Sequence, residues 1–570
     1  MRRRTFLGMT AAAGAMPSFG VLSDRIARVG VMTDTHIGTT MESCLRVKAA
    51  LELFKAQGAE MVVNCGDVAD QHYPEGYRCY RKTVNEVFPD PASRPQELFV
   101  YAFHDVCDYR PNSGWNVARY AGPAFADMHR FLEAPNTHTD SREWKGMAFL
   151  NFPQATGMKG FLSWEEYEAK VRRACETHPG KPVFVFDHLP PAGTTFHSRQ
   201  WGSDECRRVL NKFPQVVSIS GHVHGSLASE RQIWQGEFTA VNAGCLQTWG
   251  GFAPGSKPPP QAKENFGVLV MDIYADRLVF MRLDVRDGSS FGAPWVVPLP
   301  FVKREAPYRP CVAAKRSRPV AFASSAALSV APGAAGYTIS FPAADAGAQP
   351  FMYRLSAERK TAGGTWRPFT RDDLFSEFWK APKDRAGKTS FTMDAAFFTP
   401  GERYRMTVAP LDWFYREGNA LRCEFTAALP VAEPVWRSDD PMTELRFTEH
   451  GKPVEKSTGG LFAPASGQGT LRLPEHAFKG LEPGKRARCV IDLDTVQPDG
   501  VWCAWRVSLC PRGRGRGLAV VQTVPGTPGP LRYVFSFDVP KDGLDTCDLR
   551  FNYVSPGASL RVLHVAVICG

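Results

Sequence analysis

The stretch Gly221-His222-Val223-His224 follows a short apolar run at residues 216–220. In a turn at the end of a strand, two imidazoles one residue apart can each reach a separate ion of a close metal pair. Asp34-Thr35-His36 and Gly66-Asp67, far upstream, add carboxylates and a further imidazole. Divalent ions with mixed oxygen and nitrogen ligands bind such sets of Asp and His side chains. These three stretches therefore predict a metal site.

From residue 28 to about residue 300, short apolar runs alternate with helical segments. The runs that end in a polar cluster are residues 29–32, 61–65, 98–103, 183–186 and 216–220. A helical face between the first two runs carries Cys44, Val47, Leu51 and Phe54. Ser163 with Glu166 is a capping box that opens a helix to about residue 178. An α/β architecture places its site beyond the carboxyl ends of its strands, so the polar clusters are expected to meet there.

Five of these clusters together resemble the calcineurin-like metallophosphoesterase family over residues 28–300. In chain order they are DxH at residues 34–36, GDxxD at residues 66–70, His104-Asp105, His188 followed by Leu-Pro-Pro, and GHxH at residues 221–224. The resemblance implies a layered α/β domain in which a β-sandwich is flanked by helices. It also implies hydrolysis of a phosphomonoester or phosphodiester by a metal-activated water.

The resemblance assigns a role to each matching residue. Asp34, His36 and His224 would hold the first metal, and Asp67 would bridge both ions. His188 and His222 would belong to the second metal. His104 would lie beside the leaving oxygen as general acid or charge stabiliser, with Asp105 orienting its ring, and Asp70 would orient the loop or a ligand. The implied cofactors are two divalent ions of manganese, iron or zinc, or one tightly held ion.

Phe103 departs from the family pattern, which has an Asn before the His. That Asn contributes a carbonyl oxygen to the second metal, and a phenyl ring cannot replace it. Asp108, Asn112 and Asn116 are candidate substitutes, although each also suits an ordinary loop. Three interpretations stay open: an active phosphoesterase with an atypical second site, a mononuclear or slowed enzyme, and a non-catalytic protein on a degenerate scaffold that binds carbohydrate or a surface.

Several other side chains are candidates for the substrate mouth. Arg110 is a candidate phosphate clamp, with a surface salt bridge as the alternative. His197 and His72 are candidates to line the mouth, with simple solvation as the alternative. Trp201 and Trp249 would either wall the cleft or pack in the core. The substrate itself is expected to be a phosphorylated small molecule or polymer.

Two all-β domains are expected to follow a linker at residues 301–317. Residues 399–408 in the first, residues 318–429, resemble the turn, tyrosine corner and strand of a fibronectin type III domain. Residues 430–570 alternate strands with Gly and Pro turns, which favours a jelly-roll-like sandwich similar in outline to carbohydrate-binding modules. A glycan or cell-surface ligand is the expected partner of these domains. The basic loop at residues 512–516 suits either an anion or a solvated hairpin tip.

Residues 1–27 predict an export signal. The stretch Arg2-Arg3-Arg4-Thr5-Phe6-Leu7-Gly8 resembles a twin-arginine signal, and a small-residue stretch at residues 9–19 follows. A basic, disordered N-terminus with no export role is the alternative. Periplasmic or secreted location is therefore expected. No other stretch is apolar enough to span a bilayer, and the mature chain is expected to lack a transmembrane segment.

The bulk composition is that of a globular protein. The 570 residues carry a net charge of +10, which is too mild an excess for a nucleic-acid footprint. The 14 cysteines form no tight CxxC pairs. Some of the five near the end (Cys489, Cys503, Cys510, Cys547 and Cys569) could pair in an oxidising periplasm. Neither a G-x-S-x-G elbow nor a P-loop is present, which argues against a serine hydrolase and a kinase.

Overall fold

The computed structural model describes most of the chain, and every statement below concerns these residues. They are residues 24–38, 41–70, 74–106, 126, 128–133, 139, 141–158, 161–247, 266–309, 320–344, 350–378, 380, 385–445, 447–454, 461–463, 468–496, 505–512, 517–522, 530–553 and 559–570. Residues 1–23 of the predicted export signal lie outside them, as do His72, Asp108, Arg110, Asn112, Asn116, Trp249 and Cys503.

Two six-stranded sheets form the first domain. One has the order β12-β11-β10-β1-β2-β3 and the other β4-β5-β6-β7-β9-β8. The strands of the first sheet are β1 (Ala27–Met32), β2 (Met61–Asn64), β3 (Gln96–Phe99), β10 (Gly267–Ile273), β11 (Arg277–Asp284) and β12 (Trp295–Pro298). Those of the second are β4 (Ser141–Trp144), β5 (Met147–Asn151), β6 (Val183–Phe186), β7 (Val216–Ser220), β8 (Ile233–Gln235) and β9 (Thr239–Asn242).

The core of this domain lies between the two sheets, where β1, β2, β6 and β7 are fully buried or nearly so. Such strands are apolar on both faces because helices cover the outer sides. The helices are α1 (Met41–Gln57), α2 (Pro74–Val87), α3 (Phe103–Val106), α5 (Trp164–Thr177), α6 (Ser198–Trp201) and α7 (Asp204–Leu210). α1 and α2 pack on the first sheet, and α5 and α7 on the second. The predicted layered α/β sandwich is confirmed.

Sequence patterns located most of these elements. The predicted capping box opens α5, where the Ser163 side chain accepts from the Glu166 backbone and the Glu166 side chain accepts from the Ser163 backbone. The predicted strand at residues 98–103 is wrong at its end, because β3 stops at Phe99 and Phe103 opens the short helix α3. The apolar sequence extends beyond the end of β3, because residues 100–102, in the turn that follows the strand, are also buried.

Two antiparallel β-sandwiches follow, as the pattern of strands and turns predicts. The first pairs the sheets β13-β14-β17 and β16-β15-β18-β19. Its strands are β13 (Ser329–Gly333), β14 (Gly336–Pro342), β15 (Met352–Lys360), β16 (Trp366–Phe375), β17 (Lys388–Met393), β18 (Arg403–Leu411) and β19 (Leu421–Thr426). The Tyr404 hydroxyl accepts a hydrogen bond of 2.9 Å from the Thr399 backbone nitrogen.

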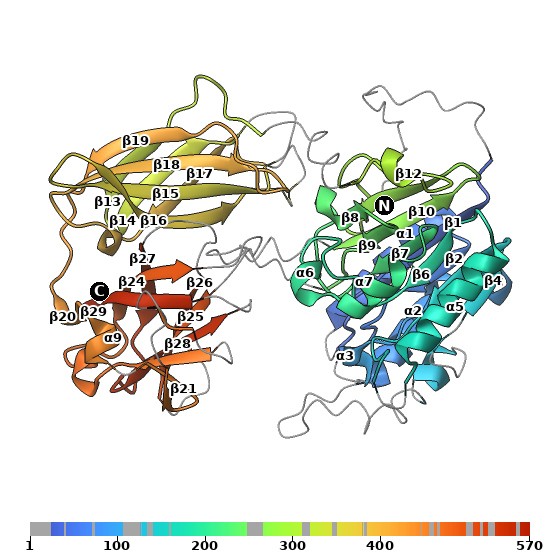
Figure 1. The fold of residues 1–570 in the computed structure, drawn as a ribbon, viewed down its shortest axis with the longest axis horizontal. Helices are drawn as coiled ribbons and strands as arrows, with labels where there is room; N and C mark the ends of the chain where they lie inside the picture. The colour runs from blue at the N-terminus through green and yellow to red at the C-terminus, as the bar shows by residue number, and fades with distance from the viewer. Residues whose placement is uncertain are drawn as a thin grey trace, which may run out of the picture.

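The last sandwich pairs the sheets β20-β29-β24-β27 and β22-β21-β23-β28-β25-β26. Its strands are β20 (Pro434–Ser438), β21 (Phe447–Glu449), β22 (Lys452–Pro453), β23 (Gln468–Arg472), β24 (Arg486–Val496), β25 (Trp505–Pro511), β26 (Ala519–Gln522), β27 (Leu531–Asp538), β28 (Cys547–Tyr553) and β29 (Ser559–Cys569), with the short helix α9 (Pro441–Glu444). Short 3-10 helices are η2 (Pro91–Ser93), η3 (Glu230–Gln232), η5 (Lys303–Glu305), η7 (Ala395–Phe397) and η8 (Glu475–Phe478). Figure 1 shows the two sandwiches together on one side of the molecule and the first domain on the other, with α6 facing the sandwiches.

Three observations bear on the remaining sequence predictions. The beginning of the predicted linker packs on the first domain, because the Tyr308 hydroxyl accepts from the Val296 backbone at 2.8 Å. Arg512, in the basic loop, donates to Asp548 at 2.8 Å, so in the structure it forms an internal ion pair. Within the described residues, no helix combines the length and apolarity that crossing a membrane needs.

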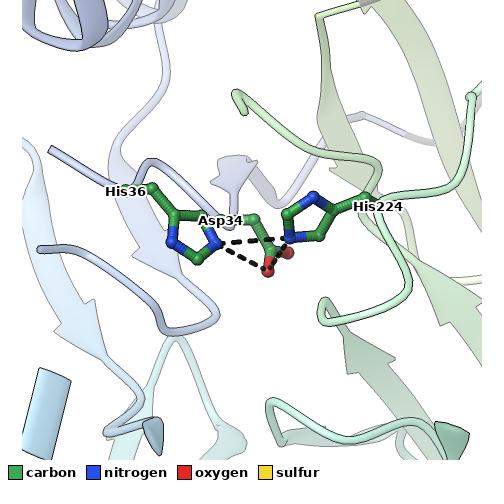
Figure 2. A group of neighbouring side chains, drawn as sticks. All are labelled: Asp34, His36 and His224. Atoms are coloured by element: carbon green, nitrogen blue, oxygen red, sulfur yellow. Dashed lines mark hydrogen bonds and ion pairs between the residues drawn. The ribbon is translucent and has the colours of Figure 1, made fainter. Parts of the chain in front are cut away.

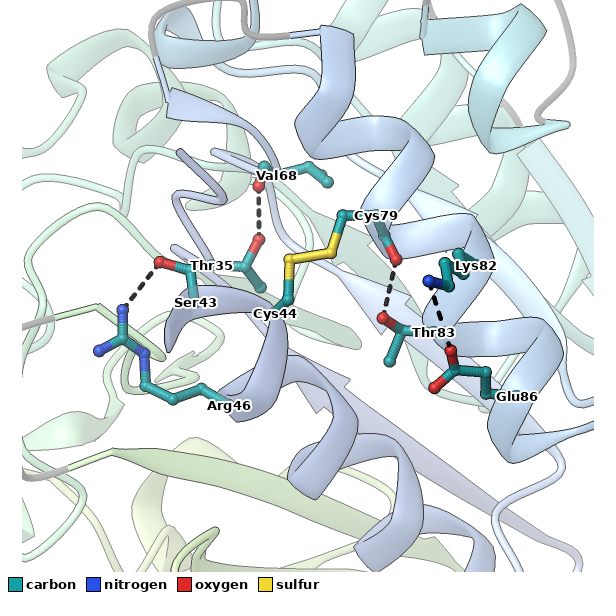
Figure 3. The surroundings of a disulfide bond; sticks show 9 residues. All are labelled: Thr35, Ser43, Cys44, Arg46, Val68, Cys79, Lys82, Thr83 and Glu86. Atoms are coloured by element: carbon teal, nitrogen blue, oxygen red, sulfur yellow. Dashed lines mark hydrogen bonds and ion pairs between the residues drawn. A yellow bond between two sulfur atoms is a disulfide. The ribbon is translucent and has the colours of Figure 1, made fainter. Parts of the chain in front are cut away.

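The disulfide in the described residues joins Cys44 to Cys79, and thus α1 to α2 (Figure 3). The sequence prediction missed it, because Cys44 fits the apolar face of its helix equally well. Cys489, Cys510 and Cys569 near the chain end are free thiols, so they do not pair with one another.

Candidate metal centre

The ends of four strands bring the predicted ligands to one edge of the sandwich. Asp34 and His36 follow β1, Asp67 follows β2, His188 follows β6, and His222 with His224 follows β7. β1 and β2 are parallel, as are β6 and β7, so within each sheet the carboxyl ends meet. Backbone hydrogen bonds tie the loops together, from Asp34 to Gly66 at 3.0 Å, from His36 to Asp67 at 2.9 Å and from Gly221 to His188 at 3.1 Å.

These loops have an unusual backbone. Five of the predicted ligands have positive φ angles in the left-handed region, namely Asp34 (51°), His36 (40°), Asp67 (54°), His222 (70°) and His224 (45°). Such a conformation costs a non-glycine residue about 1–3 kcal/mol and persists where the surroundings impose it. Five left-handed residues in one place indicate that the positions required of the side chains, rather than the conformational preferences of the backbone, determine the structure of these loops.

Asp34, His36 and His224 form the first group of ligand atoms (Figure 2). The Nε2 atoms of the two histidines are 3.3 Å apart. His224 Nε2 lies 3.0 Å from Asp34 Oδ1, and His36 Nε2 lies 3.8 Å from the same oxygen. The structure thus brings together the three residues predicted to hold the first metal.

Asp67 belongs to two further groups, one with Asp34 and His188 and one with His36 and His104. His188 Nε2 lies 3.0 Å from Asp67 Oδ2 and 3.8 Å from Asp34 Oδ1. A hydrogen bond of 2.9 Å joins His188 Nδ1 to the Cys65 carbonyl, which accepts it, so Nε2 is the atom turned toward the carboxylates. Asp67 therefore has the position that a shared ligand requires, and Asp34 occupies a similar one.

The residues present fit a divalent cation. Asp34 Oδ1 and His188 Nε2 are buried and have no hydrogen-bond partner among the described residues. Buried carboxylate and imidazole atoms are normally satisfied, because leaving them bare costs desolvation energy. A cation that accepts electron pairs from both satisfies both, and the mixture of carboxylate oxygens with imidazole nitrogens suits manganese, iron or zinc.

The electrostatics of the ligands agree with a cation site. Burial raises the pKa of the Asp34 carboxyl, but the neighbouring His224 and His188 outweigh it and hold the pKa well below its usual range. Burial lowers the pKa of His36, but contacts with Asp34 and Asp70 outweigh it and raise the pKa to about 10. For His188, Asp67 and Asp34 likewise outweigh burial and raise the pKa to about 9. The carboxylates thus attract positive charge strongly.

His222 lies beside these groups rather than in one of them. Its backbone nitrogen donates to Asp34 Oδ2 at 2.9 Å, and its ring centroid is 5.1 Å from that of His188. Burial and the nearby His188 lower the pKa of His222 to about 4. The ring is therefore neutral at pH 7, and a ring nitrogen can donate its lone pair to a cation. Its assignment to the second metal stays a prediction.

The predicted partner of His104 is wrong. Asp70, rather than Asp105, contacts the ring, with 2.9 Å between His104 Nδ1 and Asp70 Oδ1. Asp105 is fully buried and accepts hydrogen bonds from the backbone nitrogens of Val68, Ala69 and Ala102 at 2.9, 3.0 and 3.2 Å. Burial, then Asp67, raises the pKa of Asp105 to about 7. Asp105 thus shapes the Asp67 loop, and Asp70 orients His104.

His197 does not suit the predicted substrate-lining role. Both ring nitrogens are buried, and the ring packs on Phe196 with centroids 3.9 Å apart. Burial, then Arg231, lowers the pKa of His197 to about 3. Trp201, in contrast, is 46% exposed and its ring centroid lies 6.2 Å from that of His222, at the metal centre.

Phe103 is half-buried and packs against the core beneath α1 and α2. Its backbone nitrogen donates to Gln154 Oε1 at 2.8 Å, which fixes the start of α3. The next residue, His104, donates its backbone hydrogen to Asp67 Oδ1 at 3.1 Å. The segment that carries the unusual Phe therefore still holds Asp67 in place.

Sequence reasoning missed three supporting residues. Thr33 Oγ1 donates to Asp34 Oδ2 at 2.8 Å, and Asn242 Nδ2 donates to the Gly221 carbonyl at 2.7 Å. Asn64 Oδ1 accepts from Gly66 at 3.1 Å. A side chain at Gly221 would lie 1.9 Å from Thr33 Oγ1, so only glycine fits there. An Asn at the end of β2 and another at the end of β9 were the available signals.

Comparison with known proteins shows a similarity to one protein family. The model of the calcineurin-like phosphoesterase family matches residues 27–226. Solved structures that resemble the chain include a dimetal phosphatase from Danio rerio, with 13% identity over 48% of this chain and 99% of that one, at a TM-score of 0.33. A purple acid phosphatase from yellow lupin seeds, Lupinus luteus, has 15% identity over 48% of this chain and 53% of that one, at a TM-score of 0.35.

A xylan-binding domain from Paenibacillus barcinonensis shares 8% identity over 25% of this chain and 97% of that one, at a TM-score of 0.17. With TM-scores this low, the likenesses carry no argument about function. No curated protein is a significant match to the chain. Residues 27–226 carry a calcineurin-like phosphoesterase domain.

Proposed function

We propose that this protein is an exported, metal-dependent hydrolase of a phosphomonoester or phosphodiester. The observation that supports this most is the overlap of three groups of ligand atoms, in which the buried atoms Asp34 Oδ1 and His188 Nε2 make no hydrogen bond to a described residue. Asp34, His36 and His224 would hold one ion, and the Asp67 carboxylate would be a ligand of both ions. His188 and His222 would complete the second ion, with manganese, iron or zinc as the candidates.

When bound, the ions supply positive charge to the phosphoryl oxygens and an activated water. The side chains of the chain do the rest. His104 is about one-third exposed, so its ring can reach a bound ester, and Asp70 holds Nδ1. The ring can then give a proton from Nε2 to the leaving oxygen. Asp105 and Thr33 keep the Asp67 and Asp34 carboxylates in position.

Turnover of aryl phosphates tests the proposal. The purified protein should hydrolyse 4-nitrophenyl phosphate or bis(4-nitrophenyl) phosphate with added Mn²⁺, Fe²⁺ or Zn²⁺ and lose the activity to a chelator. Asp67→Asn should abolish it. Asp90→Asn is the matched control, because Asp90 is exposed and Asn also serves as an N-cap. Absence of turnover with every metal, or full activity in Asp67→Asn, would exclude the hydrolase.

The alternative is a non-catalytic carbohydrate- or surface-binding protein on a degenerate scaffold. Phe103 favours it, since it removes an expected metal ligand, and the two β-sandwiches supply surface for a glycan. We favour catalysis because the remaining ligand set is intact. Phe103→Asn should raise the metal content at the second site and increase turnover, whereas Phe103→Leu should change neither. If Phe103→Asn leaves both unchanged, the assignment of this position is incorrect.

The export proposal has support in the first domain. The Cys44–Cys79 disulfide suits an oxidising compartment such as the periplasm. We further propose that the middle sandwich is fibronectin type III-like, which the Tyr404 contact supports. Replacement of Arg3 and Arg4 by Lys should retain the protein in the cytoplasmic fraction. Unchanged periplasmic recovery would exclude the twin-arginine route.

A further inference from the structure

A deeply buried ring of the first domain, Phe196, packs into the middle sandwich. This side chain is 3% exposed and joins an apolar cluster whose other fully buried members belong to the sandwich: Phe351, Met352, Phe375, Phe378, Leu411 and Trp413. Its ring lies edge-on to Phe351 at 5.8 Å and parallel to Tyr415 at 6.5 Å. Phe196 comes eight residues after His188, so the loop beyond a candidate metal ligand is anchored in another domain.

A second loop is anchored at the same place. Arg231 follows the candidate ligand His224, and its guanidinium lies 4.9 Å from the centre of the Phe196 ring and 5.5 Å from that of Tyr415. It also donates to the Trp413 carbonyl at 3.4 Å. A desolvated guanidinium over aromatic faces is an attractive contact. The sandwich therefore holds both loops that leave the candidate metal centre.

The anchored loop presents Trp201. His197 has a left-handed φ of 62° and turns the chain from Phe196 into α6, which ends at Trp201. Backbone bonds between Ala192 and Ser203 (3.0 Å) and between Ser203 and Pro190 (2.9 Å) close the loop at its base. Trp201 is thus an exposed indole on a fixed support, beside His222.

We infer that Trp201 is a specificity-determining residue: its indole binds an aromatic ring in the leaving group of the phosphate ester, and docking of the middle sandwich through Phe196 holds it there. This inference rests on the proposed function. Aromatic rings pack favourably against an indole when they are offset or edge-on. Among the large hydrophobic side chains that are exposed in the described residues, Trp201 is the aromatic one, and it lies at the metal centre.

Phosphonates test the contact without relying on turnover. Calorimetry on the full, metal-loaded protein should compare phenylphosphonate with methylphosphonate. Trp201→Ala should weaken phenylphosphonate binding about 10-fold and leave methylphosphonate binding within about 2-fold, with Trp201→Phe in between. Leu45→Ala, at an exposed apolar position on α1, is the control and should change neither. An equal effect of Trp201→Ala on both ligands, or no effect, overturns the inference.

A sandwich variant tests the coupling. Trp413→Ala should give the same selective loss of phenylphosphonate binding, whereas Trp366→Ala, in the same sandwich but outside the cluster, should not. Wild-type phenylphosphonate affinity in a folded Trp413→Ala protein overturns the coupling. The proposed function fails separately: Trp201-dependent phenylphosphonate binding without hydrolysis of phenyl phosphate would keep the aryl contact but remove both the hydrolase and the leaving-group role of Trp201.

Discussion

Asp70 and Asp105 both lie close to His104, but they accept hydrogens from different groups. Asp70 contacts the ring, whereas Asp105 accepts three backbone hydrogens beneath it. A carboxylate that orients a catalytic ring affects the chemical step, and one that satisfies buried backbone groups affects stability. The two carboxylates therefore have separable roles.

Substitution of Asp70 and of Asp105, one at a time, should separate the catalytic role from the structural role. Asp70→Asn is expected to lower kcat about 10- to 100-fold while the melting temperature stays nearly constant. Asp105→Asn should lower the free energy of unfolding by about 1–3 kcal/mol, because the amide replaces an acceptor with a donor facing backbone N–H groups. Steady-state kinetics and urea unfolding measure the two effects. A larger loss of kcat in Asp105→Asn than in Asp70→Asn at equal folded fraction would contradict this assignment.

Metal uptake should release protons at neutral pH. The pKa values of His36 and His188, about 10 and 9, mean that both rings are protonated at pH 7 without metal. A metal ligand must be deprotonated, so filling the sites at pH 7 should release about two protons, and affinity should rise with pH up to these values. Without metal, the stabilising ion pairs are complete below pH 6.5 and are lost as the pH rises through 9 and 10. Calorimetry in buffers of different ionisation enthalpy gives the proton count, and a count of zero would contradict these pKa values.

Most of the candidate metal ligands could be predicted from the sequence, but the residues that hold these ligands in position could not. Asp34, His36, Asp67 and His224 were identifiable because each ends an apolar run, and the end of a strand is fixed by local pattern. The role of Asp105 could not be predicted, because it depends on the direction in which the backbone N–H groups of Val68 and Ala69 point. That direction is set by the left-handed turn at Asp67, which residue types do not reveal.

At the scale of elements, α1 and α2 each follow a ligand-bearing loop and are joined by the Cys44–Cys79 disulfide (Figure 3). Thr35 Oγ1 also donates to the Val68 carbonyl at 2.7 Å, so the two loops are linked next to the helices. The helices were predictable from their apolar faces. The cross-link was not, because pairing depends on a distance between elements that spacing does not encode.

Removal of this disulfide should destabilise the protein. The bond closes a segment with a sequence separation of 35 residues, so the Cys44→Ser, Cys79→Ser double variant is expected to lose about 2–4 kcal/mol of unfolding free energy. Urea unfolding under non-reducing conditions measures it, with Cys175→Ser, a free and half-buried thiol, as the control. A double variant as stable as the control would show that the cross-link contributes nothing.

At the scale of the whole molecule, Asp394 is one of the contacts between the two sandwiches; another is Thr370 Oγ1, which donates to the Arg532 carbonyl at 2.8 Å. The Asp394 side chain pairs with Arg488, accepts from Ser536 at 3.4 Å and caps η7 through Ala396 at 2.9 Å. Ala396 also packs against Val490, Ala566 and Ile568 of the last domain. The pattern of strands and turns predicted two all-β sandwiches, but it contains no information on which strands face each other between domains.

The two sandwiches are therefore expected to unfold together. Asp394→Ala should leave Arg488 without its carboxylate and cost about 1–3 kcal/mol, which would separate the shared calorimetric transition into two. Asp439→Ala removes an exposed carboxylate that contacts His564 and should leave the transition intact. One unchanged transition in Asp394→Ala would contradict coupling through this residue.

We expect divalent cations to bind where Asp34, His36, Asp67, His188 and His224 converge. Elemental analysis tests this expectation most directly, on protein loaded with Mn²⁺, Fe²⁺ or Zn²⁺ and then dialysed. The wild type should retain one or two ions per chain, and Asp34→Asn should lose them, since Asp34 belongs to two of the three ligand groups. A wild type that retains no ion, or an Asp34→Asn protein that retains as many, would contradict it.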